Sequence, residues 1–196
     1  MKKRYLALLP TLFLAACSNT HQPLSKDALV GEWVCSTAYK DVGVGMLDVI
    51  TLKADGTLED DNYIFDHSLD RFVGKDPENY FRSPLRYFRV HNGTWNLSDN
   101  DLTYHLKQTN FKRIIWPDVW EQLQEIDELK QIEAKAFKIY SSTKEADIQL
   151  TFNKFIKNGF TLNQNLNGRI YESKCLDKQS SEYRYIEAYK KIHKSK

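Results

Sequence analysis

The stretch that decides the fold is MLDVITLKADGTLEDDNYIF, residues 46–65. Residues 46–53 alternate apolar and polar side chains, which is typical of a strand with one buried face. An Asp-Gly pair follows at Asp55 and Gly56, and such a pair between two strand-like runs is a strong hairpin signal. Residues 57–65 predict the returning strand. The segment therefore predicts an antiparallel β-hairpin.

Further strand-like runs recur on both sides of this hairpin, and Gly, Pro, Asn or Asp residues separate them. They lie at residues 31–37, 85–91, 92–97, 102–108, 137–142, 147–155, 160–164 and 168–176. The pattern predicts a mainly β chain, an antiparallel barrel or sandwich of about 8–10 strands. No linker divides residues 29–196, so we expect one β-rich domain there.

One internal helix is predicted at residues 117–132, because Val119, Leu123, Ile126 and Leu129 recur at helical spacing. Its first residue is a proline, which suits the first turn of a helix. A second, short helix is predicted near the C-terminus.

Composition supports a folded domain and gives no global argument for a nucleic-acid partner. Hydrophobic residues are 41% of the 196 and charged residues 28%, as in globular proteins. Lys2, Lys3 and Arg4 supply three of the 28 basic residues. The rest of the chain therefore has 25 basic and 26 acidic residues. A nearly neutral chain is not expected to bind an anionic polymer through its overall charge.

The N-terminus reads as an export signal. Three basic residues precede an apolar run over residues 6–14, and small residues follow before Cys17. This order is typical of a secretory signal peptide, and the run is too short for a comfortable membrane-spanning helix. We expect residues 1–16 to be removed.

The quartet Leu14-Ala15-Ala16-Cys17 resembles a bacterial lipobox. That resemblance implies fatty acylation at Cys17, with palmitate among the expected chains, and cleavage just before it. The alternative is an ordinary signal peptide with an incidental cysteine. Ser18 follows, and in Gram-negative lipoproteins a residue other than Asp there implies the outer membrane. We therefore expect a lipid-anchored envelope protein facing the periplasm, with residues 17–28 as a flexible tether.

The other two cysteines, Cys35 and Cys175, predict a disulfide, because an even pair in an oxidising compartment is read that way. The bond would require the first and last strands to be neighbours, as a closed barrel supplies. Two buried free thiols or a reactive cysteine are the alternatives, although neither cysteine has an adjacent His or a C-x-x-C partner.

Three short motifs resemble those of small bacterial lipocalin-like lipoproteins: G-x-W, D-G-T and G-T-W, in that order. Their residues include Gly31, Trp33, Asp55, Gly56, Gly93 and Trp95. The resemblance implies a lipocalin-like barrel in which Trp33 packs across the closed end. A barrel of this size has room for packed side chains or one small ligand. The second half of the chain matches no motif of the family, and its helix lies earlier than in true lipocalins.

Catalytic and metal-binding signatures are missing from the sequence. It contains no GxSxG, HExxH, P-loop or CxxC motif, and its five His residues lack ligand spacing. His67 lies beside Asp66 and near Asp70, and three further acids precede them at residues 59–61. A cation site could use these groups, but a solvated acidic loop is the simpler interpretation. Residues 80–89 interleave aromatic residues with arginines and predict a strand with aromatics on one face and arginines in solvent.

These observations lead to two hypotheses about function. The first is a lipid-anchored binding module that holds a small apolar ligand or docks an envelope component. The alternative is an interaction or inhibitor protein with a solid core that acts through its loops. We expect no enzyme activity, no catalytic residues, no cofactor, no metal and no nucleic-acid partner.

Overall fold

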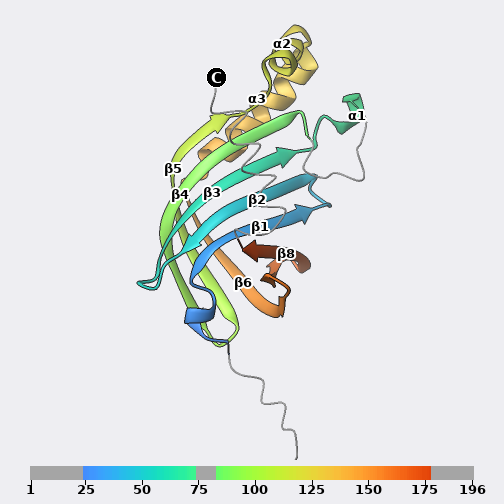
Figure 1. Ribbon diagram of the computed structural model, residues 1–196. Coiled ribbons are helices and arrows are strands. Elements are labelled where there is room, and N and C mark those ends of the chain that lie inside the picture. Colours follow the sequence, from blue (N-terminus) through green and yellow to red (C-terminus); the bar gives the residue numbers. More distant parts are fainter. Residues whose placement is uncertain (1–23, 74–82, 178–196) are drawn as a thin grey trace, which may run out of the picture.

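In a computed structural model, which describes residues 24–73 and 83–177, eight strands form a closed antiparallel barrel (Figure 1). Each strand pairs with the next in sequence, and the last pairs with the first. The strands are β1 Gly31–Tyr39, β2 Val44–Leu52, β3 Thr57–Asp66, β4 Leu85–Ser98, β5 Asp101–Arg113, β6 Glu145–Ile156, β7 Gly159–Leu166 and β8 Arg169–Asp177. The closure confirms the barrel and excludes the sandwich.

The central hairpin forms as predicted, between β2 and β3. Asp55 stabilises the turn, because its Oδ1 accepts hydrogen bonds from the backbone N–H of Thr57 at 2.8 Å and from its hydroxyl at 2.7 Å. Gly56 has a φ of +85°, a conformation that side chains with a Cβ rarely adopt. The Asp-Gly pair is therefore a requirement of this turn.

β4 is one long strand where the sequence predicts two, at residues 85–91 and 92–97. Gly93 lies in its interior and does not end it. A Cβ at this position would lie 1.9 Å from the carbonyl oxygen of His105 on β5. The glycine therefore permits a close approach of two strands instead of marking a turn.

Two helices, rather than one, connect β5 to β6: α2 Pro117–Glu125 and α3 Asp127–Ser142. Ile126 separates them in an extended conformation. The predicted strand at residues 137–142 is wrong, because these residues continue α3. Phe137 and Tyr140 extend the helical spacing that starts at Leu129, and this tertiary packing outweighs their strand propensity. A short helix α1 Asp70–Val73 and a 3-10 helix Lys26–Ala28 complete the described elements.

The predicted disulfide between Cys35 and Cys175 is confirmed, and it closes the barrel covalently. The two residues lie directly opposite each other on β1 and β8. The next inward-facing pair, Thr37 and Ser173, joins its hydroxyls at 2.5 Å. The seam between the first and last strands is therefore held by backbone, side-chain and covalent bonds.

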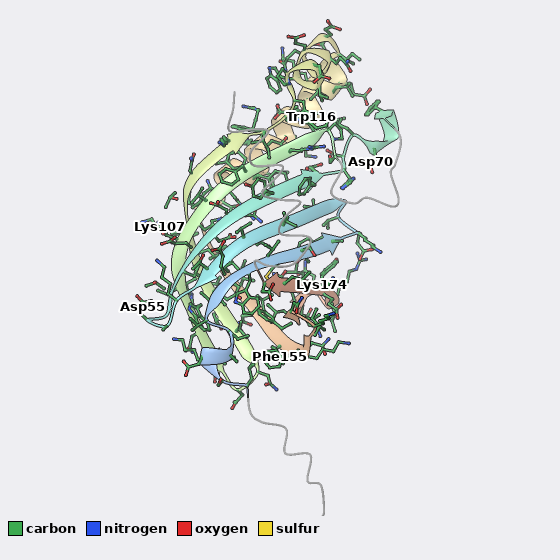
Figure 2. The ribbon with its side chains drawn as sticks, in the orientation of Figure 1. Asp55, Asp70, Lys107, Trp116, Phe155 and Lys174 are labelled. Carbon is green, nitrogen blue, oxygen red and sulfur yellow. A yellow bond between two sulfur atoms is a disulfide. The ribbon has the colours of Figure 1, made fainter. Side chains whose placement is uncertain are left out.

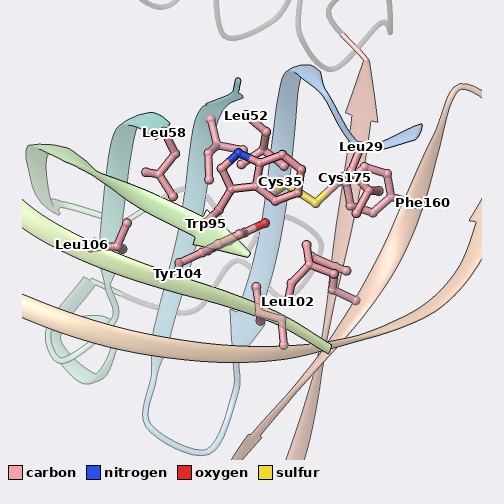
Figure 3. Packing of buried hydrophobic residues seen from close by; sticks show 13 residues of the cluster. Leu29, Cys35, Leu52, Leu58, Trp95, Leu102, Tyr104, Leu106, Phe160 and Cys175 are labelled. Atoms are coloured by element: carbon pink, nitrogen blue, oxygen red, sulfur yellow. A yellow bond between two sulfur atoms is a disulfide. The ribbon is translucent and has the colours of Figure 1, made fainter. Parts of the chain in front are cut away.

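An apolar cluster, here called the Trp95 cluster, fills one end of the barrel (Figure 3). Trp95 is 2% exposed, and its Nε1 donates to the carbonyl of Lys53 at 2.9 Å. Trp33 packs beside it against the edge of Phe160 and donates to the carbonyl of Leu29 at 2.8 Å. Trp33 therefore packs at a filled end of the barrel.

A second apolar cluster, the Tyr87 cluster, lies at the other end, where α2 and α3 cover the barrel (Figure 1). Tyr87 is fully buried and donates to Glu133 of α3 at 3.3 Å. Arg113 on β5 donates to the same carboxylate at 2.7 Å. Figure 2 shows Trp116 and Asp70 at this end and Asp55 at the opposite one. Both barrel ends are therefore packed.

The described chain begins inside the segment that the sequence assigns to the tether. Leu24 packs against the Trp95 cluster, and the Lys26 ammonium lies 4.8 Å from the centre of the Trp95 ring. Residues 1–16, Cys17 and the predicted C-terminal helix lie outside the described residues. Among the described helices, none is both long and apolar enough to cross a membrane.

Candidate functional site

A polar layer separates the two apolar clusters inside the barrel. On β3 the inward positions run Leu58, Asp60, Asn62 and Ile64. Leu58 belongs to the Trp95 cluster and Ile64 to the Tyr87 cluster, and both are buried. The two polar residues between them are also buried, at 4% and 1% exposure. Burial without a partner is costly for such groups, so their contacts decide what the layer can do.

Neighbouring strands add to the layer at the same height. Asp60 lies opposite His91 on β4, and Asn62 lies opposite Arg89. Asp48 lies opposite Asn62 from the β2 side. The full set, which we call the polar layer, is Thr37, Asp48, Asp60, Asn62, Arg89, His91, Gln164 and Ser173.

Asp60 and His91 form the most buried ion-pairing contact of the layer. Nδ1 of His91 lies 2.8 Å from Oδ2 of Asp60. The other carboxylate oxygen, Oδ1, is buried and has no hydrogen-bond partner among the residues that the structure describes. One half of this carboxylate is therefore satisfied and the other is open.

Arg89 reaches the acids through an intermediate. Its Nε donates to Oδ1 of Asn62 at 2.6 Å, and Nδ2 of Asn62 donates to Oδ1 of Asp48 at 2.5 Å. The amide is thereby oriented by a cation on one side and a carboxylate on the other. Asn62 links the guanidinium to Asp48, while Asp60 pairs with His91.

Burial dominates the titration of both acids. Removal from water raises the pKa of Asp60 to about 7, although the charge of Arg89 counteracts this. Burial, followed by repulsion from Asp60, raises the pKa of Asp48 to about 7, against the hydrogen bond from Asn62. Near neutral pH each of the two carboxyl groups is therefore partly protonated.

The basic groups shift in the opposite direction for the same reason. Burial and the charge of Arg89 lower the pKa of His91 to about 4. Burial also lowers the pKa of Arg89, although the nearby acids hold it up. Neutral imidazole is therefore the form of His91 at neutral pH, and the guanidinium carries the positive charge of the layer.

The polar layer borders an interior cavity of about 70 Å³. Asp48, Asp60, Arg89 and His91 form one side, with Tyr104 near them. Apolar side chains complete the wall: Met46, Ile50, Leu106, Ile148, Leu150 and Leu162. Pockets for drug-sized ligands are several times larger, about 300–1,000 Å³. The cavity fits a molecule of a few non-hydrogen atoms.

The loop around His67 is not part of this layer. His67 pairs with Asp70 at 3.1 Å, while Asp66 accepts from the hydroxyl of Tyr140 at 2.7 Å and from the N–H of Ser68 at 2.8 Å. Among the described residues, no group of three or more His, Cys, Asp or Glu side chains is arranged to hold a metal ion. The acidic loop anchors α3 to β3.

The interpretation of residues 80–89 needs correction, because Arg86 and Arg89 are not in solvent. Arg86 is 8% exposed and lies beneath the ring of Trp116, 4.5 Å from its centre. Arg89 points into the barrel. Tyr87 faces inward and Phe88 outward, so the aromatics occupy both faces. Residues 80–82 lie outside the described part of the chain.

Sequence reasoning missed the polar layer, although a signal for it exists. It assigned Asp60 to a solvated acidic loop, whereas Asp60 is buried within β3. Asp48 shares its side of the strand with Ile50, and Asp60 shares its side with Leu58. Arg89 alternates in step with the buried Tyr87. The signal is a charged residue at a strand position where the alternation predicts a buried apolar side chain.

The fold and the site define a class: an eight-stranded, disulfide-closed antiparallel barrel with a polar cavity between two apolar plugs. Neither a scan against protein-family models nor a search of curated proteins finds a match to this chain.

Proposed function

We propose that the protein is a lipid-anchored envelope protein whose lipocalin-like barrel binds a small molecule in its interior. The observation that carries the proposal is the cavity of about 70 Å³, lined by charged groups on one side and apolar groups on the other. Ligand sites typically combine apolar walls with a few placed polar groups. The size favours a short ligand over the long apolar chain that many barrels hold.

The anchor rests on the sequence of residues 14–17 and is a separate part of the proposal. The mature N-terminal peptide should begin at Cys17 and carry acyl mass. The Cys17→Ser variant should leave the membrane fraction. A protein that retains Met1, or an unmodified Cys17, would contradict the anchor without affecting the cavity.

A size-matched pair of variants tests binding in the cavity. Ile148 faces the cavity from β6, and its neighbour Gln149 is exposed on the outer face. Ile148→Trp should fill the space, whereas Gln149→Trp adds a similar ring outside. Each purified protein is incubated with a small-molecule extract of the cell envelope, and retained molecules are identified by native mass spectrometry.

We expect the wild type and Gln149→Trp to retain the same molecule and Ile148→Trp to lose it. Thermal unfolding shows whether each variant is folded, and Ile148→Phe gives a smaller step if the larger ring is not tolerated. Equal retention by the wild type and a folded, filled variant would refute interior binding. Chemical conversion of the retained molecule would overturn the expectation of a binding protein in favour of an enzyme.

A docking function is the second candidate, and one surface feature favours it. Val42, in the turn between β1 and β2, is 66% exposed. Leu166 at the end of β7 and Ile170 near the start of β8 are 41% and 70% exposed. An ion pair between Arg169 and Asp41 at 3.0 Å links these two regions. A partner whose capture is lost in Ile170→Glu, and kept in Ile148→Trp, would favour docking over ligand binding.

A further inference from the structure

The open oxygen of Asp60 indicates what kind of ligand the cavity takes. Asp60 lines the cavity, and its Oδ1 is shielded from solvent and has no donor among the described residues. A buried acceptor without a partner costs free energy, and nearly all such groups in native proteins have one. A ligand that donates a hydrogen bond at this point would remove the cost.

The balance of charge favours a cationic donor. The ionisable groups that line the cavity are Tyr39, Asp48, Asp60, Arg89, His91 and Tyr104, from β1 to β5; the lining residues of β6, β7 and β8 are neutral. Two acids face one guanidinium, and His91 and the tyrosines are neutral at neutral pH because burial opposes their charged forms. With both acids ionised, the interior carries one excess negative charge.

We propose that the cavity binds a small organic amine, whose ammonium group donates to Oδ1 of Asp60 and is neutralised by Asp60 and Asp48. The inference rests on the proposed function and names the chemistry of its ligand. A short apolar body of the amine lies against Ile148, Leu150 and Leu162 on the other wall. A bare divalent ion fits less well, because it needs more oxygen ligands than two acids supply.

Three probes of similar size test the charge requirement: propylammonium, 1-propanol and propionate. The readout is the ¹H–¹³C methyl NMR spectrum of the purified protein, since Ile148, Leu150 and Leu162 report directly on the cavity. We expect propylammonium to shift these methyl signals and to bind at least about tenfold more tightly than 1-propanol. Propionate should not bind.

Asp60→Asn is the matched variant, because the amide keeps an acceptor for His91 and removes the charge. We expect it to weaken propylammonium binding by about tenfold or more and to leave 1-propanol nearly unchanged. Asp147→Asn, at an exposed Asp–His pair, is the control and should change neither affinity. Binding of propylammonium should also tighten from about pH 5.5 to pH 8, as the two acids lose protons.

The outcomes separate this inference from the proposed function. If 1-propanol or propionate binds as well as propylammonium, or if Asp60→Asn keeps the preference for the amine, the cationic ligand is wrong. Retention of a neutral or anionic molecule from the envelope extract would also contradict a cationic ligand, but it would still support binding in the interior. If no probe shifts the methyl signals and no molecule is retained, both fail. Asp48→Asn repeats the test should Asp60→Asn not fold.

Discussion

Two Asp–His pairs in this molecule have almost the same geometry and opposite surroundings. Nδ1 of His91 lies 2.8 Å from Asp60, with side chains 5% and 4% exposed. Nδ1 of His105 lies 2.7 Å from Asp147, with side chains 57% and 77% exposed. Both pairs join neighbouring strands of one barrel. The contact is therefore constant, and the solvent around it is what differs.

The comparison shows that the same contact geometry has different energetic consequences in water and in the barrel interior. An exposed ion pair contributes little, since water and salt screen it. Inside the barrel the same pair has lost its water, and burial shifts the pKa of Asp60 up to about 7 and that of His91 down to about 4. Such groups respond to whatever else enters the cavity, which makes the buried pair the functional candidate.

The largest expected effect comes from removing the disulfide that joins β1 to β8. Replacing both Cys35 and Cys175 with Ala removes a crosslink between residues 140 apart. The loop-entropy model assigns such a bond about 4–5 kcal/mol. We expect a loss of that order in urea unfolding, and also a lower pKa of Asp60 as water gains access, while the exposed pair stays as it is. An unchanged free energy of unfolding would contradict this prediction.

The second effect concerns the cation that both interior acids share. Arg89→Met leaves Asp48 and Asp60 without a guanidinium, and an uncompensated buried charge costs about 3–5 kcal/mol. The matched control is Arg169→Met, which breaks an exposed pair with Asp41 and should cost less than about 1 kcal/mol. Urea unfolding at neutral pH measures both. Equal losses in the two variants would mean that burial does not distinguish these arginines.

A third effect is a dependence of stability on pH that the buried acids of the polar layer should show and the exposed Asp147 should not. Because the pKa of Asp60 is raised from 3.8 to about 7, the folded protein binds more protons than the unfolded chain between these values. Its free energy of unfolding therefore falls as pH rises, by at most about 1.4 kcal/mol per pH unit for one acid. Asp60→Asn lacks the part of this decline that Asp60 causes, while Asp48, whose pKa is also raised to about 7, keeps its own part. The variant should therefore gain stability relative to the wild type from pH 4 to pH 7.

The control for this titration is again the exposed pair. His91 acts in the opposite direction, because its lowered pKa adds stability as pH rises from about 4 to 6.5, and it is present in both proteins. Asp147→Asn should show no such gain relative to the wild type. Parallel pH profiles for the wild type and Asp60→Asn would rule out a raised pKa at Asp60.

Most of the barrel could be predicted from the sequence because its signals are local. The turn at Asp55 and Gly56 depends on backbone geometry that few residues adopt, and the alternation around it fixes the face of each strand. The pairing of Cys35 with Cys175 was predicted from the even number of remaining cysteines and from the expected oxidising compartment. The helix at residues 137–142 was missed because its strand-forming residues are helical only through packing on Tyr87.

The site was harder to predict because no single segment contains it. The polar layer takes residues from six strands, and each contributes one or two polar side chains to an otherwise apolar face. A lone Asp48 or Arg89 at such a position reads as an imperfection of the strand pattern. Only the register, which places Asp60 opposite His91 and Asn62 opposite Arg89, turns these imperfections into one cluster.

The smallest expected effect is the coupling within the exposed pair, and it completes the comparison. A double-mutant cycle with His105→Ala and Asp147→Ala should give a coupling energy within about 0.5 kcal/mol, falling further with added salt. The same cycle at His91 and Asp60 should exceed about 1 kcal/mol and resist salt, because the barrel wall excludes ions. Since distance and residue types are matched, the ratio of the two couplings measures the combined effect of enclosure and of the neighbouring charges of Arg89 and Asp48. Equal couplings would mean that water reaches Asp60 as freely as Asp147. That result would contradict the proposal of a binding site in the barrel interior.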